Sequence, residues 1–137
     1  MSEKGRVELI RAGFDAWERG DVEEALGHYH PEVETFAPPE IGNSGTFHGI
    51  DGFMQWTQAW FEAWESFDQE LISVEPIGET HVLQKVMQTG RGKGSGIEVG
   101  REATYVYDIR GEKLAFIALF FTHEDALALA LEREASD

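Results

Sequence analysis

The sequence predicts an α+β fold, with helices in the first half of the chain and an antiparallel meander of strands in the second. Up to residue 67, apolar residues recur every three or four positions, which is typical of helices that bury one face. From residue 69 the pattern changes to that of strands. Residues 114–121 carry no polar side chain, which indicates a strand covered on both faces, one by the chain's helices and the other by a second subunit.

Two helices are expected at the start of the chain. Over residues 7–19, apolar side chains fall on one helix face. Gly20 ends this helix, because glycine readily adopts the left-handed conformation found after helix ends. Asp21 begins a short second helix, with Glu24 placed as in a capping box, and Pro31 ends it.

A third helix is expected from about residue 52 to residue 67. Its apolar stripe, with spacings of three, four, four and three, consists of aromatic residues: Phe53, Trp56, Trp60, Trp64 and Phe67. Before it, residues 34–37 predict a brief strand. Residues 38–49, rich in Pro and Gly, predict a loop at the rim of a pocket.

The second half predicts four strands and a last helix. Residues 69–77 and 81–89 form the first two strands, and residues 97–121 form two long ones joined at 110–112. The glycine-rich stretch 90–96 lies between strands and precedes no helix, so it predicts a hairpin connection and no phosphate site. Thr122 caps the last helix, which we expect to fray beyond Glu132.

Composition narrows the class of protein. The chain has 137 residues, an apolar fraction of 42% and no interdomain linker, so we expect residues 1–137 to form one domain. The net charge of −15 argues against nucleic acid and anionic membranes as partners. The absence of Cys excludes disulfides and thiolate metal sites. With no apolar run of ~18 residues and no signal-peptide core, we expect a cytoplasmic protein.

Six short motifs, spread over nearly the whole chain, carry a family resemblance. They are WERGD at 17–21, HPEV at 30–33, FHGIDG at 47–52, GSG at 94–96, RGEKL at 110–114 and AL at 126–127. In this order and spacing the chain resembles the nuclear transport factor 2-like superfamily, and within it the SnoaL-like polyketide cyclase group. The resemblance implies a cone-shaped fold: a curved, mostly antiparallel sheet with three N-terminal helices across its concave face and a short C-terminal helix.

The resemblance also implies a small hydrophobic ligand in an apolar pocket, no cofactor, and a homodimer through the convex sheet face. Functions in the superfamily range from ketosteroid isomerisation and polyketide cyclisation to ligand binding and protein scaffolding, so the fold does not fix the function. Its enzymes commonly place an Asp or Glu at the end of the last strand, where this chain has Thr122. Three functions stay open: a small-molecule-binding protein, a cyclase or isomerase acting on a polyketide- or steroid-like substrate, and a non-catalytic interaction module.

The fourth strand presents the most informative polar residues. Tyr105 and Tyr107 share one face with Arg101, since residues two apart point the same way. If this face is concave, two phenols and a guanidinium enter the pocket as donors to a carbonyl or carboxylate. If it is convex, the tyrosines pack in a dimer interface and Arg101 pairs with an acidic neighbour. Gln84 shares a face of the third strand with Val86 and Gln88, and either it orients a ligand in a mostly apolar pocket or this is a solvated strand end.

The remaining candidates come from the helices and the histidines. The expected ligand pocket contains Phe14, Trp17, Tyr29, Phe53, Trp56, Trp60, Gln84 and Arg101, although the rings of the third helix fit a plain core equally well. His30 is a candidate general base, and Tyr105 and Tyr107 are the other catalytic candidates. No ligand spacing predicts a metal site. His48 and His81 lie beside turns and are expected to face solvent.

Overall fold

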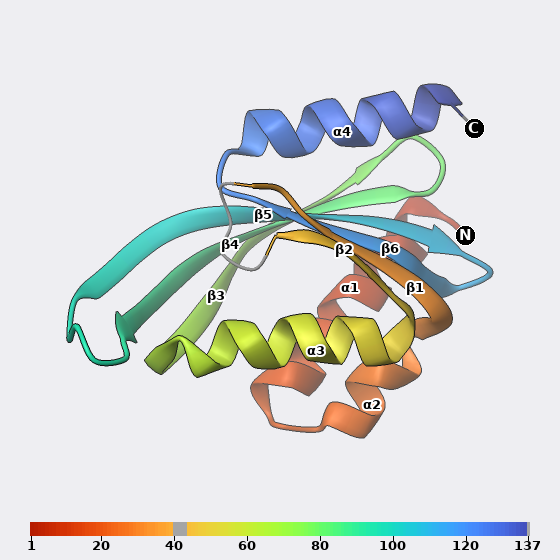
Figure 1. The fold of residues 1–137 in the computed structure, drawn as a ribbon. Coiled ribbons are helices and arrows are strands. Elements are labelled where there is room, and N and C mark those ends of the chain that lie inside the picture. Colours follow the sequence, from red (N-terminus) through yellow and green to blue (C-terminus); the bar gives the residue numbers. More distant parts are fainter. Residues whose placement is uncertain (40–43, 137) are drawn as a thin grey trace.

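The computed structural model describes residues 1–39 and 44–136. Over these residues the chain forms one six-stranded sheet with helices on both sides (Figure 1), which confirms the predicted α+β class. The helices are α1 (Glu3–Glu18), α2 (Val22–Gly27), α3 (Gly49–Glu62) and α4 (His123–Ser136). The strands are β1 (Tyr29–Ala37), β2 (Gly45–His48), β3 (Trp64–Ile77), β4 (His81–Gly92), β5 (Glu98–Arg110) and β6 (Lys113–Phe120).

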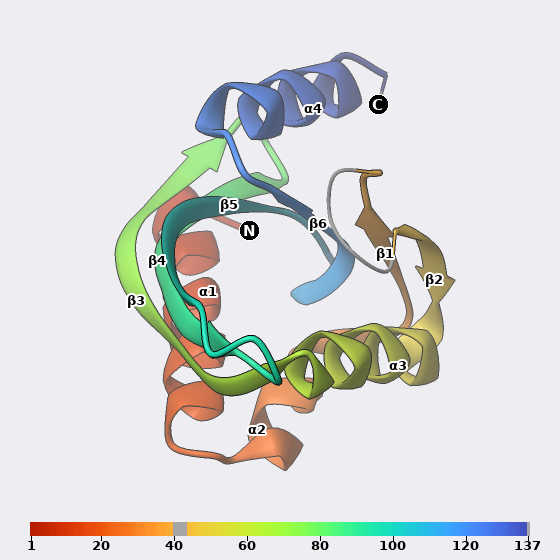
Figure 2. The same ribbon diagram turned by 60° about the vertical axis from the view of Figure 1, so that its left-hand side comes forward.

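The strand order of the sheet is β2-β1-β6-β5-β4-β3. The predicted antiparallel meander is present as β3 to β6, and β1 extends it by pairing parallel to β6. Register shifts in the β3–β4 and β5–β6 pairings mark bulges, which increase local twist and bend the strands. Figure 2 shows the resulting arc of β3, β4 and β5, with α3 across one end. The sheet is therefore curved, as the resemblance implies.

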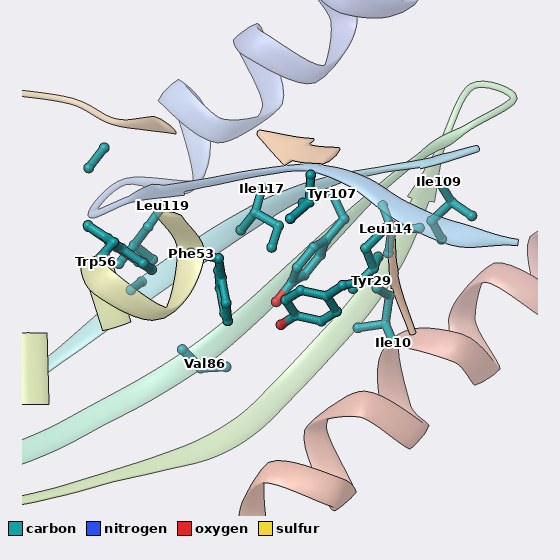
Figure 3. Packing of buried hydrophobic residues seen from close by; sticks show 14 residues of the cluster. Ile10, Tyr29, Phe53, Trp56, Val86, Tyr107, Ile109, Leu114, Ile117 and Leu119 are labelled. Carbon is teal, nitrogen blue, oxygen red and sulfur yellow. The ribbon is translucent and has the colours of Figure 1, made fainter. Parts of the chain in front are cut away.

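Each face of the sheet has its own apolar core. The inner face, toward α1 and α3, packs the cluster shown in Figure 3, which includes Ile10, Phe53 and Ile117. The outer face packs Leu83, Val106 and other residues against Ala126 and Ala130 of α4. The apolar strand at 114–121 is thus covered on both sides. Its outer cover is α4 of the same chain, where a second subunit was expected.

The third helix is shorter than predicted. It runs over Gly49–Glu62, and Trp64 and Phe67 belong to β3 instead. The aromatic spacing suggested a single helix because the rings do pack together, but they belong to α3 and β3. Trp60 of α3 lies 6.0 Å from Trp64 and 5.9 Å from Phe67 of β3, measured between ring centroids. Gly90 on β4 makes room for this packing, since a Cβ there would come within 2.8 Å of the Trp64 ring.

Other boundaries also differ from the prediction. The second helix ends at Gly27, and Pro31 lies inside β1, within an interval where the pairing with β6 is irregular. Residues 45–48, predicted as loop, form β2, while residues 40–43 of that loop lie outside the described residues. Strand β4 continues into the glycine-rich stretch as far as Gly92. Among the described residues, none of the helices is long and apolar enough to cross a membrane.

His81 is buried, so the prediction that it faces solvent is wrong. It has no exposed surface, and it lies on the outer face beneath α4. Its Nδ1 is 2.6 Å from a carboxylate oxygen of Glu134, and its Nε2 accepts a hydrogen bond from Arg133 at 3.1 Å. Asp108, directly opposite His81 on β5, is buried beside it and pairs with Arg133.

The β3–β4 turn at residues 77–81 is held from two sides, and we call this arrangement the turn clamp. The Glu134 carboxylate of α4 accepts the backbone N–H groups of Glu79, Thr80 and His81 at 3.0–3.2 Å. From α1, the buried Arg6 guanidinium donates to the carbonyls of Ile77, Gly78 and His81 at 2.7–3.3 Å. Both terminal helices are therefore attached to one turn. This explains why α4 stays helical beyond Glu132, as far as Ser136.

Candidate functional site

A cavity of about 300 Å³ lies between α1, α3 and the inner face of the sheet. This volume is at the lower end of the ~300–1,000 Å³ typical of small-molecule sites. Half of the residues that line it are aromatic: Phe14, Trp17, Tyr29, Phe53, Trp56, Trp60, Phe61, Phe67, Tyr105 and Tyr107. Leu9, Ile10, Leu114 and Ile117 add aliphatic surface. The cavity can therefore hold a small, mainly apolar body.

The helical wall is one continuous run of rings. Trp17 of α1 meets Phe53 of α3 at 6.2 Å between centroids, and Phe53, Trp56 and Trp60 follow one another along α3 at 6.4 Å. Phe53 and Trp56 are each only 5% exposed. These rings are therefore both core and cavity wall, because α3 packs on the sheet with the same face that it turns to the cavity. Such packing fixes the shape of the wall before any ligand enters.

Polar groups converge on the cavity from the sheet. The Tyr107 hydroxyl donates to Gln84 Oε1 at 2.7 Å, and the Tyr29 hydroxyl accepts from Trp17 Nε1 at 3.4 Å. Figure 3 shows the hydroxyls of Tyr29 and Tyr107 pointing into the same space. Tyr105 stacks on Tyr107 at 5.9 Å between ring centroids, and the face that carries both phenols is the inner one.

Two hydrogen-bond donors in this group are left without a protein acceptor. Gln84 is 3% exposed and its oxygen is occupied by Tyr107, yet no described residue accepts from its amide nitrogen. The Tyr29 hydroxyl receives a hydrogen bond from Trp17, and no described side chain or carbonyl accepts its proton. Buried donors normally find an acceptor. A ligand oxygen in the cavity would supply it.

The Tyr105 hydroxyl, in contrast, is engaged. It donates to Gln69 Oε1 at 3.0 Å, and the same oxygen accepts from Gln88 Nε2 at 3.1 Å. Gln69, which sequence reasoning missed, therefore joins β3 to the wall. Gln69 is the first residue of the strand predicted at 69–77, and the sequence does not show which face of that strand is concave.

The phenols are neutral donors at physiological pH. Burial raises the pKa of Tyr105 to about 12, and its hydrogen bonds with Gln69 and Gln88 oppose the shift. Burial also raises the pKa of Tyr29 and Tyr107 well above the ordinary value of tyrosine. The low-polarity wall disfavours the phenolate. All three hydroxyls thus keep their protons over the whole physiological range.

The charged residues of the wall are both acids. Glu18 at the end of α1 and Asp68 on β3 border the cavity, and both are exposed. Asp68 alternates with the inward-facing Phe67 and Gln69, so its side chain leaves the strand on the opposite face. Burial raises the pKa of Glu18, and the neighbouring charges of Asp68 and Asp15 add to the shift. Among the described residues that line the cavity, there is no Lys, Arg or His. Neither acid was a candidate from sequence, since nothing in their spacing links α1 to β3.

Of the residues predicted from sequence, the cavity wall brings together Phe14, Trp17, Tyr29, Phe53, Trp56, Trp60, Gln84, Tyr105 and Tyr107. Arg101 is not in the wall, since its guanidinium lies 3.8 Å above the Phe121 ring and 5.9 Å from Trp60. His30 is also elsewhere, with its Nδ1 accepting the Glu32 N–H at 3.0 Å. Thr122 is exposed and caps α4 through Asp125. Within the described ranges, no three His, Asp or Glu residues are grouped to hold a metal ion.

The chain matches a protein-family model and, over part of its length, a curated protein. The family model of the SnoaL-like domain matches residues 10–117. Uncharacterized protein Rv0034 of Mycobacterium tuberculosis is 35% identical over 51 residues, which are 37% of this chain and 39% of that protein. The chain thus matches about two fifths of the length of this curated relative.

Solved structures agree with the family match over almost the full chain. An NTF2-like protein from Burkholderia thailandensis superposes with a TM-score of 0.78 at 17% identity, covering 96% of this chain and 98% of the other. TerC, co-crystallized with polyporic acid, superposes with a TM-score of 0.74 at 18% identity and covers 93% and 98% of the two chains. At these identities the likeness establishes the fold alone.

Proposed function

Because this chain belongs to the SnoaL-like domain family and folds as an NTF2-like cone, we propose that its cavity binds one small, largely apolar molecule bearing a carbonyl or hydroxyl group. The reaction, if the ligand is transformed, stays unassigned. The observation that carries this proposal is the pair of unaccepted donors, the Tyr29 hydroxyl and the Gln84 amide, inside a largely apolar cavity.

The chemistry of the wall supports this ligand class. An aromatic surface gains from burying an apolar body, by roughly 25 cal/mol per Å² of apolar area. A buried donor without an acceptor costs about 1–3 kcal/mol, so a ligand oxygen that satisfies it is selected over a plain hydrocarbon. TerC, a structural neighbour, has been co-crystallized with a small organic molecule, polyporic acid. This fits the proposed use of the cone.

Replacing Tyr29 with Phe tests the role of its hydroxyl. We expect Tyr29→Phe to weaken binding of 2-acetylnaphthalene about fivefold, because the variant loses one hydrogen bond of ~1 kcal/mol to the ketone oxygen. Binding of 2-ethylnaphthalene, which has no oxygen, should be unchanged. Tryptophan fluorescence titration measures both, since Trp56 and Trp60 line the cavity. Tyr105→Phe is the matched control, because its hydroxyl already donates to Gln69. Equal losses for both naphthalenes would contradict the assignment.

An isomerase or cyclase is the second candidate, and one observation favours it. Phenols that remain protonated at neutral pH can stabilise an oxyanion in a water-poor cavity. Such an enzyme also needs a base. Of the described lining residues, the ones with a carboxylate are Glu18 and Asp68, and both are exposed. Ligand binding without acid–base chemistry is therefore the function that the cavity supports better.

The proposal extends to assembly: the protein acts in the cytoplasm as a homodimer, paired through outer sheet surface that α4 leaves open. Lys85 and Met87 of β4 lie on this face, opposite in direction to Val86 and Gln88. Light scattering after size-exclusion chromatography is expected to give twice the chain mass. A single-chain mass at about 100 μM protein would exclude the dimer, since stable homodimers bind far more tightly.

A further inference from the structure

Arg101 is a partly buried cation that has no anionic partner among the described residues. Its Nε atom is buried and makes no hydrogen bond there. Arg11 is exposed, and the other arginines each donate to a carboxylate or a backbone carbonyl: Arg6, Arg19, Arg91, Arg110 and Arg133. The chain has 26 acidic against 11 basic residues, so carboxylates are abundant. A partly buried guanidinium without one of them therefore calls for an explanation.

Aromatic rings hold the Arg101 guanidinium in place. It lies 3.8 Å above the centre of the Phe121 ring and 5.9 Å from that of Trp60. Arginine commonly stacks on aromatic faces, which leaves its in-plane N–H groups free for a planar acceptor such as a carboxylate. Loss of solvent lowers the pKa of Arg101, because burial disfavours the charged form. The guanidinium is thus both desolvated and positioned before any anion binds.

The neighbouring polar side chains do not satisfy Arg101. Gln88 of β4 lies opposite it in register, yet the Oε1 atom of Gln88 is itself buried without a donor among the described residues. Glu102 follows Arg101 in the sequence but leaves β5 on the outer face. Glu98 is engaged with Arg91. The place of the missing acceptor is therefore open to a molecule other than the described chain.

Arg101 lies on the same sheet face as the cavity. Along β5 it alternates with Ala103 and Tyr105, which belong to the inner core and to the cavity wall. Tyr105 pairs in register with Gln84, one of the two unaccepted donors. Four residues separate Tyr105 from Arg101, which is about 13 Å of strand. The arginine side chain and a ligand with two fused rings together bridge such a span.

The ring contacts of α3 give the same order of residues. From Tyr29, ring centroids follow one another to Phe53 at 4.7 Å, and then to Trp56 and Trp60 in steps of 6.4 Å. Trp60 lines the cavity and is also the neighbour of Arg101. Tyr29 thus lies toward one end of this aromatic run, and Arg101 lies beyond the other.

We propose that the ligand is an elongated apolar carboxylate, whose acid group pairs with Arg101 while its carbonyl or hydroxyl oxygen accepts hydrogen bonds from Tyr29 and Gln84. This inference rests on the proposed function of the cavity and specifies the ligand class. The apolar body lies along the rings of α3. The carboxylate lies beyond Trp60, where it supplies the acceptor that Arg101 lacks and stays in contact with water.

The test compares three probes that share one ketone. They are 6-acetyl-2-naphthoic acid, its primary amide, which has the same shape without the charge, and 2-acetylnaphthalene. Each is titrated by calorimetry into the full chain at about pH 7.5, where a carboxylic acid is ionised. Arg101→Met removes the charge, and Arg101→Lys keeps the charge without the planar fork. Arg91→Met is the matched control, because it removes an exposed charge from the neighbouring strand, where Glu98 already occupies the guanidinium.

We expect the acid to bind wild type about tenfold more tightly than the amide. This preference should fall to about twofold or less in Arg101→Met, to about threefold in Arg101→Lys, and persist in Arg91→Met. Binding of 2-acetylnaphthalene should be unchanged in Arg101→Met, which would show that the variant keeps its fold and its cavity.

Equal binding of the acid and the amide to wild type, or a preference for the acid that survives Arg101→Met, overturns the inference. If Arg101→Met binds none of the probes, Arg101→Lys decides: a reduced preference supports the pair, and an undiminished one contradicts it. If 2-acetylnaphthalene binds wild type and remains sensitive to Tyr29→Phe, the proposed function stands even when the acid has no advantage. If no probe binds wild type, both fall.

Discussion

Replacing Arg6 with Met is expected to lower the free energy of unfolding by about 3 kcal/mol and the melting temperature by ~10 °C. Arg6 is 2% exposed, and its guanidinium donates to the three carbonyls of the turn clamp, at Ile77, Gly78 and His81. Met fills much of the same volume but donates nothing. The buried carbonyls then lose their charged partner, which costs more than a single neutral hydrogen bond.

Urea denaturation followed by circular dichroism measures this effect. Arg11→Met is the matched control, because Arg11 lies on the same helix, is exposed and carries the same charge. We expect a change of less than about 0.5 kcal/mol for the control. A similarly small change in Arg6→Met would mean that the turn does not depend on α1.

Replacing Glu134 with Gln is expected to cost about 2 kcal/mol at neutral pH, because the carboxylate accepts three backbone N–H groups and the His81 ring. Burial alone would raise the pKa of Glu134, but the hydrogen bonds outweigh it and hold the pKa at about 2, against an ordinary 4.5. The stabilisation is therefore fully present above about pH 4.5. It is lost as the pH falls from there through about 2.

The pH dependence of the free energy of unfolding tests whether this stabilisation comes from the ionised Glu134 carboxylate. Between about pH 5 and pH 2, the free energy of unfolding of the wild type should fall more steeply than that of Glu134→Gln, so that the two curves approach each other in acid. Glu132→Gln, an exposed change on the same helix, should follow the wild type. Parallel curves for wild type and Glu134→Gln would show that the carboxylate is not held as described.

The fold class could be predicted from local patterns, but the clamp could not. Apolar periodicity located the helices and the meander because each element buries one stripe or face. His81 looked exposed because it follows a turn. In the fold, Glu134 of α4, which is 53 residues away in the sequence, covers it. Arg6 of α1, which is 75 residues away, binds the same turn from the opposite side. Contacts over such separations leave no periodic signal.

The candidate site was predicted in its residue types and less well in its geometry. The ring stripe of α3 and the phenols of β5 line one cavity, although the sequence left open which face of β5 is concave. Both faces carry polar residues: Tyr105 and Tyr107 on one, and on the other Asp108, which is buried under α4 and paired with Arg133. Only the position of α4, which covers the face with Asp108, shows which face of β5 is the outer one. Glu18 and Asp68 were missed because nothing in their spacing links α1 to β3.

A structure of the protein with bound 2-acetylnaphthalene is the most direct test of the account. We predict one molecule inside the cone, with its ring system against Phe53 and Trp56 and its ketone oxygen at about 3 Å from both the Tyr29 hydroxyl and the Gln84 amide nitrogen. A cavity closed by its own aromatic side chains, with the probe absent or bound on the outer face of the sheet, would contradict the proposal that this cone is a ligand site.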